Sequence, residues 1–383
     1  MKLLSSALTA LVLCVLTLSP VFAQEQLTTG AKQAIIVDYE TGSVLFEKNA
    51  DERMPTSSMS KVMTMYVLFD ALKNGKINLD DELLVSEKAW KKGGSKMFVE
   101  VGKTVRVEDL IRGIVIQSGN DATIVIAEGL AGSEDAFAGA LNRKAKELGM
   151  NNSHFMNASG WPDPDHYSTA RDLARLAEAT IKEFPDYYTY YGEESFTYHG
   201  IKQENRNPLI YKNIGADGLK TGHTEDGGYG LIGTGVKDGR RVVMVLNGME
   251  SMKERSSESA RLLQWALNGF TNITLFNNDD DLEKAPVYLG VKSEVGVKVN
   301  EPIQITIPKL FESDLKIEVE YKSPLKAPIA KGAEIGVVKV FIPKGDVITV
   351  PLVTSEDIAE LGFMMKIIAK ARLLSTGQGY LGQ

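Results

Sequence analysis

Ser58 and Lys61 stand three positions apart near the start of an apolar run, residues 54–72 (MPTSSMSKVMTMYVLFDAL). The Pro-Thr-Ser at 55–57 is a helix-start signal, so this spacing puts the hydroxyl and the amine on one face of the first turn. A serine hydroxyl is a weak nucleophile at its free pKa and needs an adjacent base. Lysine can be that base when it is neutral, and burial favours the neutral form by lowering its pKa. The pair therefore predicts a Ser58 nucleophile that Lys61 activates.

The Ser-x-x-Lys spacing alone is a weak signal, because the chain contains two further copies. They are Ser313…Lys316 and Ser323…Lys326. Both fall in a stretch that is rich in short strands, and Pro324 does not fit inside a normal helical turn. We therefore expect these two copies to carry no chemistry.

Two other short motifs distinguish Ser58 from those copies. Ser-Gly-Asn at 118–120 follows at a junction between two helical patterns, and Lys-Thr-Gly at 220–222 comes before a hairpin pattern. Neither Ser-x-Asn nor Lys-Thr-Gly occurs elsewhere in the chain. The order Ser-x-x-Lys, Ser-x-Asn, Lys-Thr-Gly is the signature of penicillin-binding proteins and class A β-lactamases.

On these motifs the sequence resembles a low-molecular-mass penicillin-binding protein, a serine-type D-alanyl-D-alanine carboxypeptidase. The stretches KTGHTEDGGYGLIGTG (220–235) and MKERSSESARLLQWALNGF (252–270) resemble the same family, and the likeness covers essentially the whole chain. It implies that Ser58 attacks the carbonyl between the two terminal D-alanines of a peptidoglycan stem peptide. The last D-alanine then leaves, and water hydrolyses the acyl-enzyme. It also implies that β-lactam antibiotics are covalent inhibitors.

The resemblance implies a role for each catalytic position. Lys61 takes the Ser58 proton. Ser118 and Asn120 lie opposite it across the cleft, where they relay that proton and hold the peptide. Lys220 adds positive charge beside Lys61, which helps to keep Lys61 neutral.

The resemblance also implies four substrate-binding positions. Thr221 binds the terminal carboxylate of the substrate, with Arg255 as a second carboxylate contact, although a solvated arginine at a helix start is the structural alternative for Arg255. Gly222 continues the Lys-Thr-Gly motif. The backbone N–H groups of Ser58 and His223 form the oxyanion hole, a role favoured over side-chain catalysis by His223.

Three alternative functions stay open at this point. A D-Ala-D-Ala endopeptidase or transpeptidase uses the same three motifs, so the motifs do not exclude it. A class A β-lactamase deacylates through a glutamate in a Glu-x-x-x-Asn setting on a loop after the second motif, and we expect no such spacing between Asn120 and Lys220. A non-catalytic scaffold of the penicillin-binding fold is disfavoured because Ser58 and Lys61 are both intact.

Strand patterns flank a block of helical patterns in the first part of the chain. Hairpins are expected over residues 33–50 and over 228–250, the second with Asp238-Gly239 at its turn. Helices are expected over residues 107–117, 121–132, 133–150, 168–184 and 253–270. Strands at both ends of a helical block indicate an α+β fold, an antiparallel sheet packed with helices. The resemblance implies that this is the penicillin-binding/β-lactamase-like transpeptidase fold, with a catalytic domain over 24–282.

A small all-β domain at about residues 285–352 and a terminal helix at 354–375 are expected next. The stretches 301–310, 314–321, 335–342 and 346–352 alternate apolar and polar residues, as short strands do. Thr354 and Asp357 resemble a capping box, and an apolar stripe would follow on the helix, formed by Ile358, Leu361, Met365 and Ile368. Lys366 and Lys370 share another face. The stripe fits an anchor lying in a membrane surface, with a helix docked on the β domain as the alternative.

The N-terminus predicts export from the cytoplasm. Residues 1–23 combine Lys2, a short apolar core and a small-residue cleavage site, which is the pattern of a secretory signal. We expect a periplasmic enzyme, peripheral on the outer face of the cytoplasmic membrane.

The single cysteine, Cys14, lies in the signal, so the mature chain has no disulfide. The net charge of −7 without a basic run argues against a nucleic-acid partner, and the four histidines lack metal-ligand spacing, so no metal or cofactor is expected.

Overall fold

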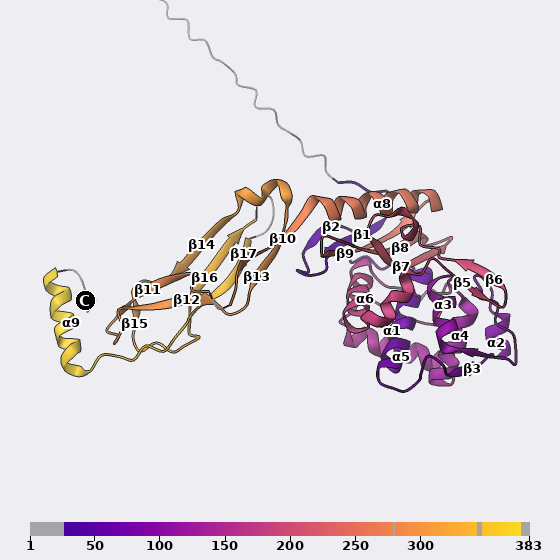
Figure 1. Ribbon diagram of the computed structural model, residues 1–383, viewed down its shortest axis with the longest axis horizontal. Coiled ribbons are helices and arrows are strands. Elements are labelled where there is room, and N and C mark those ends of the chain that lie inside the picture. The colour runs from indigo at the N-terminus through magenta and orange to yellow at the C-terminus, as the bar shows by residue number, and fades with distance from the viewer. Residues whose placement is uncertain (1–26, 279, 343–346, 377–383) are drawn as a thin grey trace, which may run out of the picture.

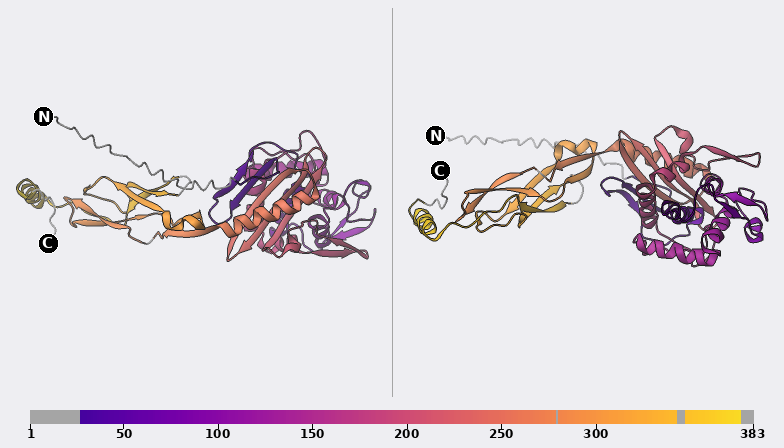
Figure 2. Two further views of the ribbon diagram at one scale, coloured as in Figure 1. Left: turned by 90° about the horizontal axis from the view of Figure 1, so that it is seen from above. Right: turned by 60° about the horizontal axis from the view of Figure 1, so that its bottom comes forward.

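The computed structural model describes residues 27–278, 280–342 and 347–376 of the 383-residue chain. The expected signal, residues 1–23, lies outside the described residues. Two bodies follow one another along the long axis of the molecule, and a helix lies at the far end of the second body (Figures 1 and 2). We name these parts the N-terminal domain (27–269), the β domain (270–361) and the terminal helix.

A five-stranded antiparallel sheet is the frame of the N-terminal domain, with strand order β2-β1-β9-β8-β7. Its strands are β1 (Gln33–Asp38), β2 (Val44–Lys48), β7 (Ala216–Thr224), β8 (Gly228–Lys237) and β9 (Arg240–Met249). Both expected hairpins are present, as β1–β2 and β8–β9. Asp238 and Gly239 have φ of +52° and +79°, the left-handed conformation that a tight two-residue hairpin turn requires. Because β7 is an edge strand, one of its sides has no strand partner.

Helices cover both faces of this sheet, because neighbouring strand residues point to opposite faces. Ile35 packs on the side of the larger helical layer, and Ile36 packs on the side of one long helix. That helix is α8 (Met252–Gly269). The larger layer contains α1 (Lys61–Lys73), α3 (Val107–Val115), α4 (Asn120–Ala131), α5 (Glu134–Glu147) and α6 (Ala170–Glu183). The five expected helices correspond to α3, α4, α5, α6 and α8, each with slightly different ends.

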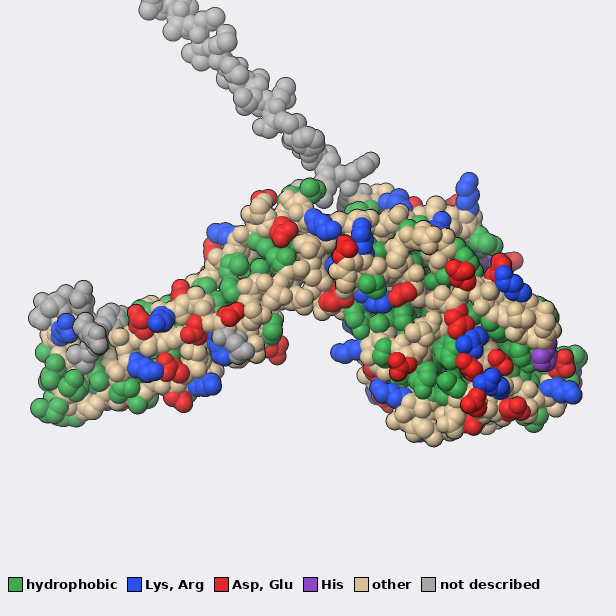
Figure 3. All heavy atoms as spheres, viewed as in Figure 1, with side chains coloured by type: hydrophobic (Ala, Val, Ile, Leu, Met, Phe, Trp, Pro, Cys, Tyr) green, Lys and Arg blue, Asp and Glu red, His purple; other side chains and the backbone are tan. Residues whose placement is uncertain are grey.

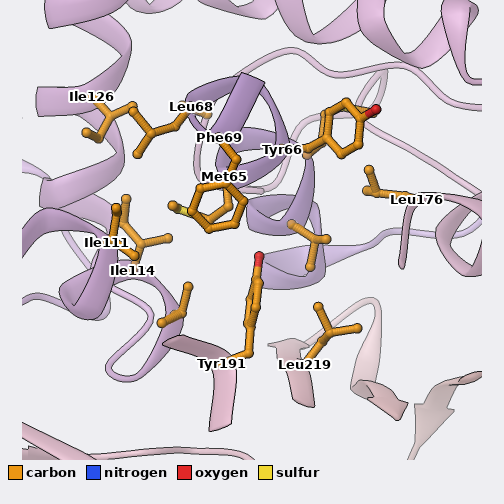
Figure 4. Packing of buried hydrophobic residues seen from close by; sticks show 14 of the residues in the cluster. Met65, Tyr66, Leu68, Phe69, Ile111, Ile114, Ile126, Leu176, Tyr191 and Leu219 are labelled. Atoms are coloured by element: carbon orange, nitrogen blue, oxygen red, sulfur yellow. The ribbon is translucent and has the colours of Figure 1, made fainter. Parts of the chain in front are cut away.

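Helix α1 lies at the centre of the helical layer and is buried on nearly every side. Figure 4 shows Met65, Leu68 and Phe69 of α1 among side chains of α3, α4 and the strand β7. An apolar helix with no polar face is stable only in such a place. The core therefore fixes the helix whose first residue is Lys61.

Short elements connect the larger ones in this domain. They are the 3₁₀ helices η1 (Ser57–Ser60), η2 (Thr189–Gly192) and η3 (Ile210–Lys212), the helices α2 (Glu87–Lys91) and α7 (Pro185–Tyr188), and the strands β3 (Glu82–Leu84), β4 (Thr104–Arg106), β5 (Ser195–Tyr198) and β6 (Ile201–Glu204).

The β domain contains a six-stranded sheet of order β14-β16-β17-β12-β11-β15 and a two-stranded sheet, β10-β13. Its elements are β10 (Phe270–Phe276), β11 (Glu283–Tyr288), β12 (Glu294–Val299), β13 (Ile303–Pro308), η4 (Lys309–Asp314), β14 (Lys316–Tyr321), β15 (Leu325–Lys326), β16 (Glu334–Phe341) and β17 (Val347–Thr354). Alternating residues such as Ile303, Ile305 and Ile307 point into one buried core. The domain begins earlier than the expected residue 285, because β10 follows α8 directly and pairs with β13.

A buried polar contact joins the two domains. Asp38 at the end of β1 pairs with Arg240 of β9, with 2.6 Å between Oδ2 and Nε. Asn272 of β10 donates from Nδ2 to Asp38 Oδ1 at 2.9 Å, and Thr306 of β13 donates to Asn272 Oδ1 at 2.8 Å. The β domain is thereby fixed to the end of the sheet formed by β1 and β9.

The terminal helix, α9, spans Phe363–Thr376 and starts nine residues later than the expected residue 354. Thr354 ends β17 and donates from its hydroxyl to the Ala330 carbonyl at 2.6 Å, so it caps no helix. Ile358 pairs with Ile329 in a β-bridge and is buried in the β-domain core. The predicted capping box and the first half of the predicted stripe are therefore wrong, because extended backbone at the edge of the β domain takes up residues 355–361.

Candidate active site

Ser58 and Lys61 meet where η1 runs into α1. In a 3₁₀ helix the side chains at i and i+3 eclipse one another. Ser58 Oγ and Lys61 Nζ lie 2.7 Å apart. The residue before the nucleophile, Ser57, has φ of +50°, a strained conformation of the kind that clusters at functional sites. The sequence prediction of a hydroxyl and an amine on one face is confirmed.

The amine of Lys61 is fully buried and has three oxygen neighbours. Besides Ser58 Oγ, these are Asn120 Oδ1 at 2.7 Å and the Ser159 carbonyl at 2.6 Å. Burial lowers the pKa of Lys61 well below its usual value, and the positive charges of Arg206 and Lys92 lower it further. Both causes favour the neutral form of the buried amine.

The second motif lies at the junction of α3 and α4. Ser118 has φ of +68°, and Asn120 is the first residue of α4. The Asn120 amide donates from Nδ2 to the Gly93 carbonyl at 2.9 Å, which turns Oδ1 toward Lys61. The loop and the helix start thus present a hydroxyl and an amide oxygen to the same space.

Lys220 reaches that space from the edge strand β7. Its Nζ lies 3.0 Å from Ser118 Oγ, and the side chain is buried. Burial lowers the pKa of Lys220 well below its usual value, with Lys61, Arg206 and Arg255 as further causes. The three motifs, far apart in sequence, therefore meet in one place, whereas Ser313 and Ser323 lie in the β domain.

The close fit of β7 against η1 depends on Gly222. A Cβ at this position would come within 2.9 Å of the Thr56 carbonyl and 3.1 Å of the Met59 side chain. A larger residue would push the strand away from the nucleophile. Gly222 therefore contributes by having no side chain, which lets β7 lie close to η1.

A cavity of about 370 Å³ opens beside Ser58. Its lining is polar and positively charged, without an aspartate or a glutamate: Ser58, Ser95, Ser118, Arg206, Thr221, Gly222, His223, Tyr229, Met252 and Arg255. The predicted residues Thr221, Gly222, His223 and Arg255 thus all face the same cavity as the nucleophile. The side chain of His223 is exposed, and its ring lies 3.9 Å from that of Tyr229.

Arg255 is the cation at the end of this cavity. It lies in the first turn of α8, is only 6% exposed, and forms no ion pair with an acidic side chain of the described residues. Its Nη1 is 3.5 Å from the Gly222 carbonyl, and its Nε has no hydrogen-bond partner among the described residues. Burial lowers the pKa of Arg255 to about 10, so the guanidinium stays charged at neutral pH. The buried, unpaired N–H favours an anionic ligand over the solvated-arginine alternative.

Several site groups were not identified from the sequence. The Ser159 carbonyl accepts a hydrogen bond from the Lys61 amine, and the positive charges of Arg206 and Lys92 lower the pKa of Lys61 in addition to burial. Asp121 accepts hydrogen bonds from three successive backbone N–H groups, residues 97–99, and so fixes the loop beside Ser95. Ser159, Lys92 and Arg206 lie in loops without a motif, whereas Asp121 is the second residue of α4, directly after the second motif.

The expectation that no Glu-x-x-x-Asn spacing lies between Asn120 and Lys220 is wrong, because the spacing occurs once, at Glu147 and Asn151. Glu147 ends α5, is largely exposed and pairs with Lys144 at 2.7 Å. It does not line the cavity. No described group of three or more His, Cys, Asp and Glu side chains could hold a metal ion.

Comparison with known proteins places the chain in a family. Residues 20–251 match the family described as D-alanyl-D-alanine carboxypeptidase, and residues 270–360 match the C-terminal domain of penicillin-binding protein 5. The chain belongs to the D-alanyl-D-alanine carboxypeptidase family. The D-alanyl-D-alanine carboxypeptidase DacA of Escherichia coli is 36% identical over 352 residues, 90% of this chain and 87% of that protein. DacF of Bacillus subtilis is 35% identical over 377 residues, 95% of this chain and 96% of that protein.

The solved structures agree with this assignment. Penicillin binding protein 5 from Haemophilus influenzae is 36% identical, with a TM-score of 0.76 over 87% of this chain and 98% of that chain. DacD from Francisella tularensis has a TM-score of 0.79 and 31% identity, covering 87% of this chain and 95% of that chain. The predicted penicillin-binding fold with an all-β C-terminal domain is thus confirmed, and the carboxypeptidase is a low-molecular-mass penicillin-binding protein.

Proposed function

We propose that this carboxypeptidase removes the terminal D-alanine from peptidoglycan pentapeptide stems through an acyl-enzyme on Ser58. The observation that carries the proposal is the set of three contacts made by Lys61. A neutral amine has two hydrogens and one lone pair. The Asn120 and Ser159 oxygens can only accept, so they take the two hydrogens, and the lone pair is left for the Ser58 hydroxyl.

The acylation step follows from this arrangement. Lys61 takes the proton as Ser58 Oγ attacks the carbonyl between the two D-alanines. Ser118, held by Lys220, passes its proton to the departing amine and regains one from Lys61, so that Lys61 is neutral again when D-alanine leaves. Lys61 then takes a proton from the attacking water, and this proton goes to Ser58 Oγ as the ester bond breaks.

The negative charge on the tetrahedral intermediate needs donors that are already in place. Ser58 is the second residue of η1, so its N–H has no partner within the helix. His223 lies on β7, whose outer side has no strand partner. We assign the oxyanion hole to these two N–H groups, with each donor contributing roughly 3 kcal/mol to transition-state stabilisation.

Arg255 and Thr221 are proposed to bind the carboxylate of the leaving D-alanine. We expect amidation of that carboxylate to lower kcat/KM by about 30–1000-fold, as for a buried charge that loses its partner. The measurement compares acid and amide forms of one pentapeptide. Arg255→Ala should remove most of this discrimination, whereas Arg261→Ala, an exposed arginine on the same helix that pairs with Glu258, should keep it. Equal turnover of acid and amide by the unchanged enzyme would favour the endopeptidase alternative.

One assay tests the reaction itself. The mature chain is incubated with a pentapeptide stem, and the products are identified by mass spectrometry. The proposal expects a tetrapeptide and free D-alanine. Cleavage only of cross-linked stems, or no cleavage, would contradict it. Fast hydrolysis of the penicillin acyl-enzyme would favour a β-lactamase, for which the cavity offers no carboxylate.

We also propose that α9 holds the exported enzyme on the outer face of the cytoplasmic membrane. The helix exposes a group of large apolar side chains, among them Phe363 (76% exposed), Met364 (70%) and Ile367 (51%). Figure 3 shows hydrophobic side chains gathered at this far end of the molecule. No helix in the described part of the chain is long and apolar enough to cross a membrane. Burying each such side chain contributes about 1.5–3 kcal/mol when complete, which supports firm but reversible surface binding.

Removing α9 after Gly362 is expected to release the enzyme from anionic vesicles while leaving penicillin labelling unchanged. The cut lies there because removal of Ile358 would open the β-domain core. Phe363→Asp with Ile367→Asp should release the full chain in the same way. Leu310→Asp, at an apolar residue of η4 that is 87% exposed, is the matched control and should leave binding unchanged. Continued sedimentation of the truncated chain with vesicles would contradict the anchor.

A further inference from the structure

A second cavity, about 610 Å³ in volume, lies beside the active site and has no role in the mechanism above. We call it the acyl-side cavity. It is lined by residues 53–57, by residues 160–167, and by Thr224 and Asp226 beyond the end of the Lys-Thr-Gly strand.

The acyl-side cavity lies on the side of Ser58 where the part of the peptide before the cleaved bond is expected. Its lining includes Ser57, the neighbour of the nucleophile, and Thr224, the neighbour of His223. The two hydroxyls of Ser57 and Thr224 lie 3.0 Å apart. With the leaving D-alanine at Thr221 and Arg255, the rest of the peptide must run the other way, past Ser58 toward this cavity. Consecutive Cα atoms are about 3.8 Å apart, so the third stem residue is the first whose side chain can extend beyond the acyl group.

The wall formed by residues 160–167 is held in place without a ligand. Asn157 Oδ1 accepts from the Trp161 backbone N–H at 2.9 Å, and Asn157 Nδ2 donates to the Trp161 carbonyl at 3.0 Å. Gly160 lies so close to the Ser57 backbone that a Cβ would come within 1.8 Å of the Ser57 carbonyl. Buried His166 lies 2.7 Å from Ser60 Oγ, which joins this wall to η1. The cavity is therefore preformed and tied to the nucleophile.

The charged groups of the cavity are mostly negative. Asp163, Asp165 and Asp226 line it, and none of them forms an ion pair within the described ranges of the chain. The one lining cation is Arg53, which stacks over the Tyr167 ring at 4.6 Å. Lys92 lies over the Trp161 ring but does not line the cavity. Aromatic and proline side chains supply apolar surface for a methylene chain, and the unpaired carboxylates suit a cation at its end.

We propose that the acyl-side cavity binds the side chain of the third stem residue and recognises a free ammonium at its end, as a diamino acid carries. The proposal rests on the proposed function, because the direction of the peptide comes from the carboxylate site. It assigns specificity to Asp163 and Asp226. Trp161 packs along the chain that leads to the ammonium.

The test uses one pair of peptides that differ only in this charge. They are Nα-acetyl-L-Lys-D-Ala-D-Ala and its Nα,Nε-diacetyl form. The unchanged enzyme is expected to have a kcat/KM about 1.4–5-fold higher for the free amine, as for a partly exposed charge pair. The preference should shrink as salt concentration rises.

Asp163→Asn with Asp226→Asn should bring the ratio between the two peptides close to one. Asparagine can still accept the hydrogen bond that Asp163 Oδ1 receives from the Asp165 N–H, so the loop keeps its shape. Each variant is compared with itself, so a general loss of rate does not affect the ratio. Asp238→Asn, the same change at the distant β8–β9 turn, should retain the full preference.

Equal turnover of both peptides by the unchanged enzyme would overturn the subsite and leave the carboxypeptidase proposal standing. A preference that persists in the Asp163/Asp226 variant would overturn it too. If the enzyme cleaves neither peptide and releases no D-alanine from a pentapeptide stem, both the proposed function and the subsite are overturned.

Discussion

Replacing Lys61 with arginine is expected to slow acylation of Ser58 by about 10²–10⁴-fold, the usual contribution of a general base. Guanidinium remains protonated at every pH that the protein tolerates, so it cannot accept the hydroxyl proton. The measurement is the rate of labelling by a fluorescent penicillin. Lys73→Arg, at the exposed end of the same helix, is the matched control and should acylate at the normal rate.

The Lys61 amine also determines how the rate of acylation is expected to depend on pH. Acylation needs the neutral amine, so the rate should fall toward acid as Lys61 gains a proton. Because burial and the nearby cations lower the pKa of Lys61 well below its usual value, the rate should reach its plateau far below the ordinary lysine range of about 10.4. A Lys61→Arg enzyme with normal rates, or a plateau reached only near pH 10, would mean that Lys61 only positions Ser58.

The sequence predicted the reacting groups well, because their spacing is local. Ser58 and Lys61 are three positions apart in helical backbone, and this local geometry brings Oγ and Nζ together. Ser118, Asn120 and Lys220 were predicted only from the order of three motifs that a family shares, since nothing in their local sequence shows that the loop before α4 and the edge strand β7 meet. The α+β sheet was predictable because its two hairpins alternate clearly and carry their own turn residues.

Groups that act through backbone atoms or from distant loops could not be predicted in this way. The Ser159 carbonyl takes a hydrogen from Lys61, but any residue type could provide that oxygen. Arg206 lines the cavity from the segment after β6, and its sequence neighbours give no sign of that contact. Such contacts depend on the tertiary arrangement of loops, which hydrophobic periodicity does not specify.

The start of the terminal helix was mispredicted for a related reason. Thr354 and Asp357 have the spacing of a capping box, but they bond to the neighbouring strand segment instead, with the Lys331 N–H donating to Asp357 Oδ1 at 2.8 Å. Ile358 fits a helical stripe and a β-domain core equally well. Ile358 is buried in the β domain because the core of that domain offers its side chain more contacts than a single helix would.

Covalent labelling at Ser58 is the second expected result with a very large effect. The hydroxyl lies 2.7 Å from the buried amine of Lys61, at the end of a cavity that suits a carboxylate, so penicillin should form an ester there. Ser58→Ala removes the only atom that can form this bond, and labelling should fall to background. Ser313→Ala and Ser323→Ala, the serines of the two other Ser-x-x-Lys copies, should label as the unchanged chain does.

Mass spectrometry of the penicillin-labelled mature chain tests the central claim most directly. After proteolysis, the account predicts one modified peptide, with the penicilloyl group on Ser58, and none in the Ser58→Ala chain. The Ser58→Ala chain should keep the thermal unfolding midpoint close to that of the unchanged chain, which shows that lost labelling is not lost folding. A penicilloyl group on any other serine, or undiminished labelling of Ser58→Ala, would contradict the account.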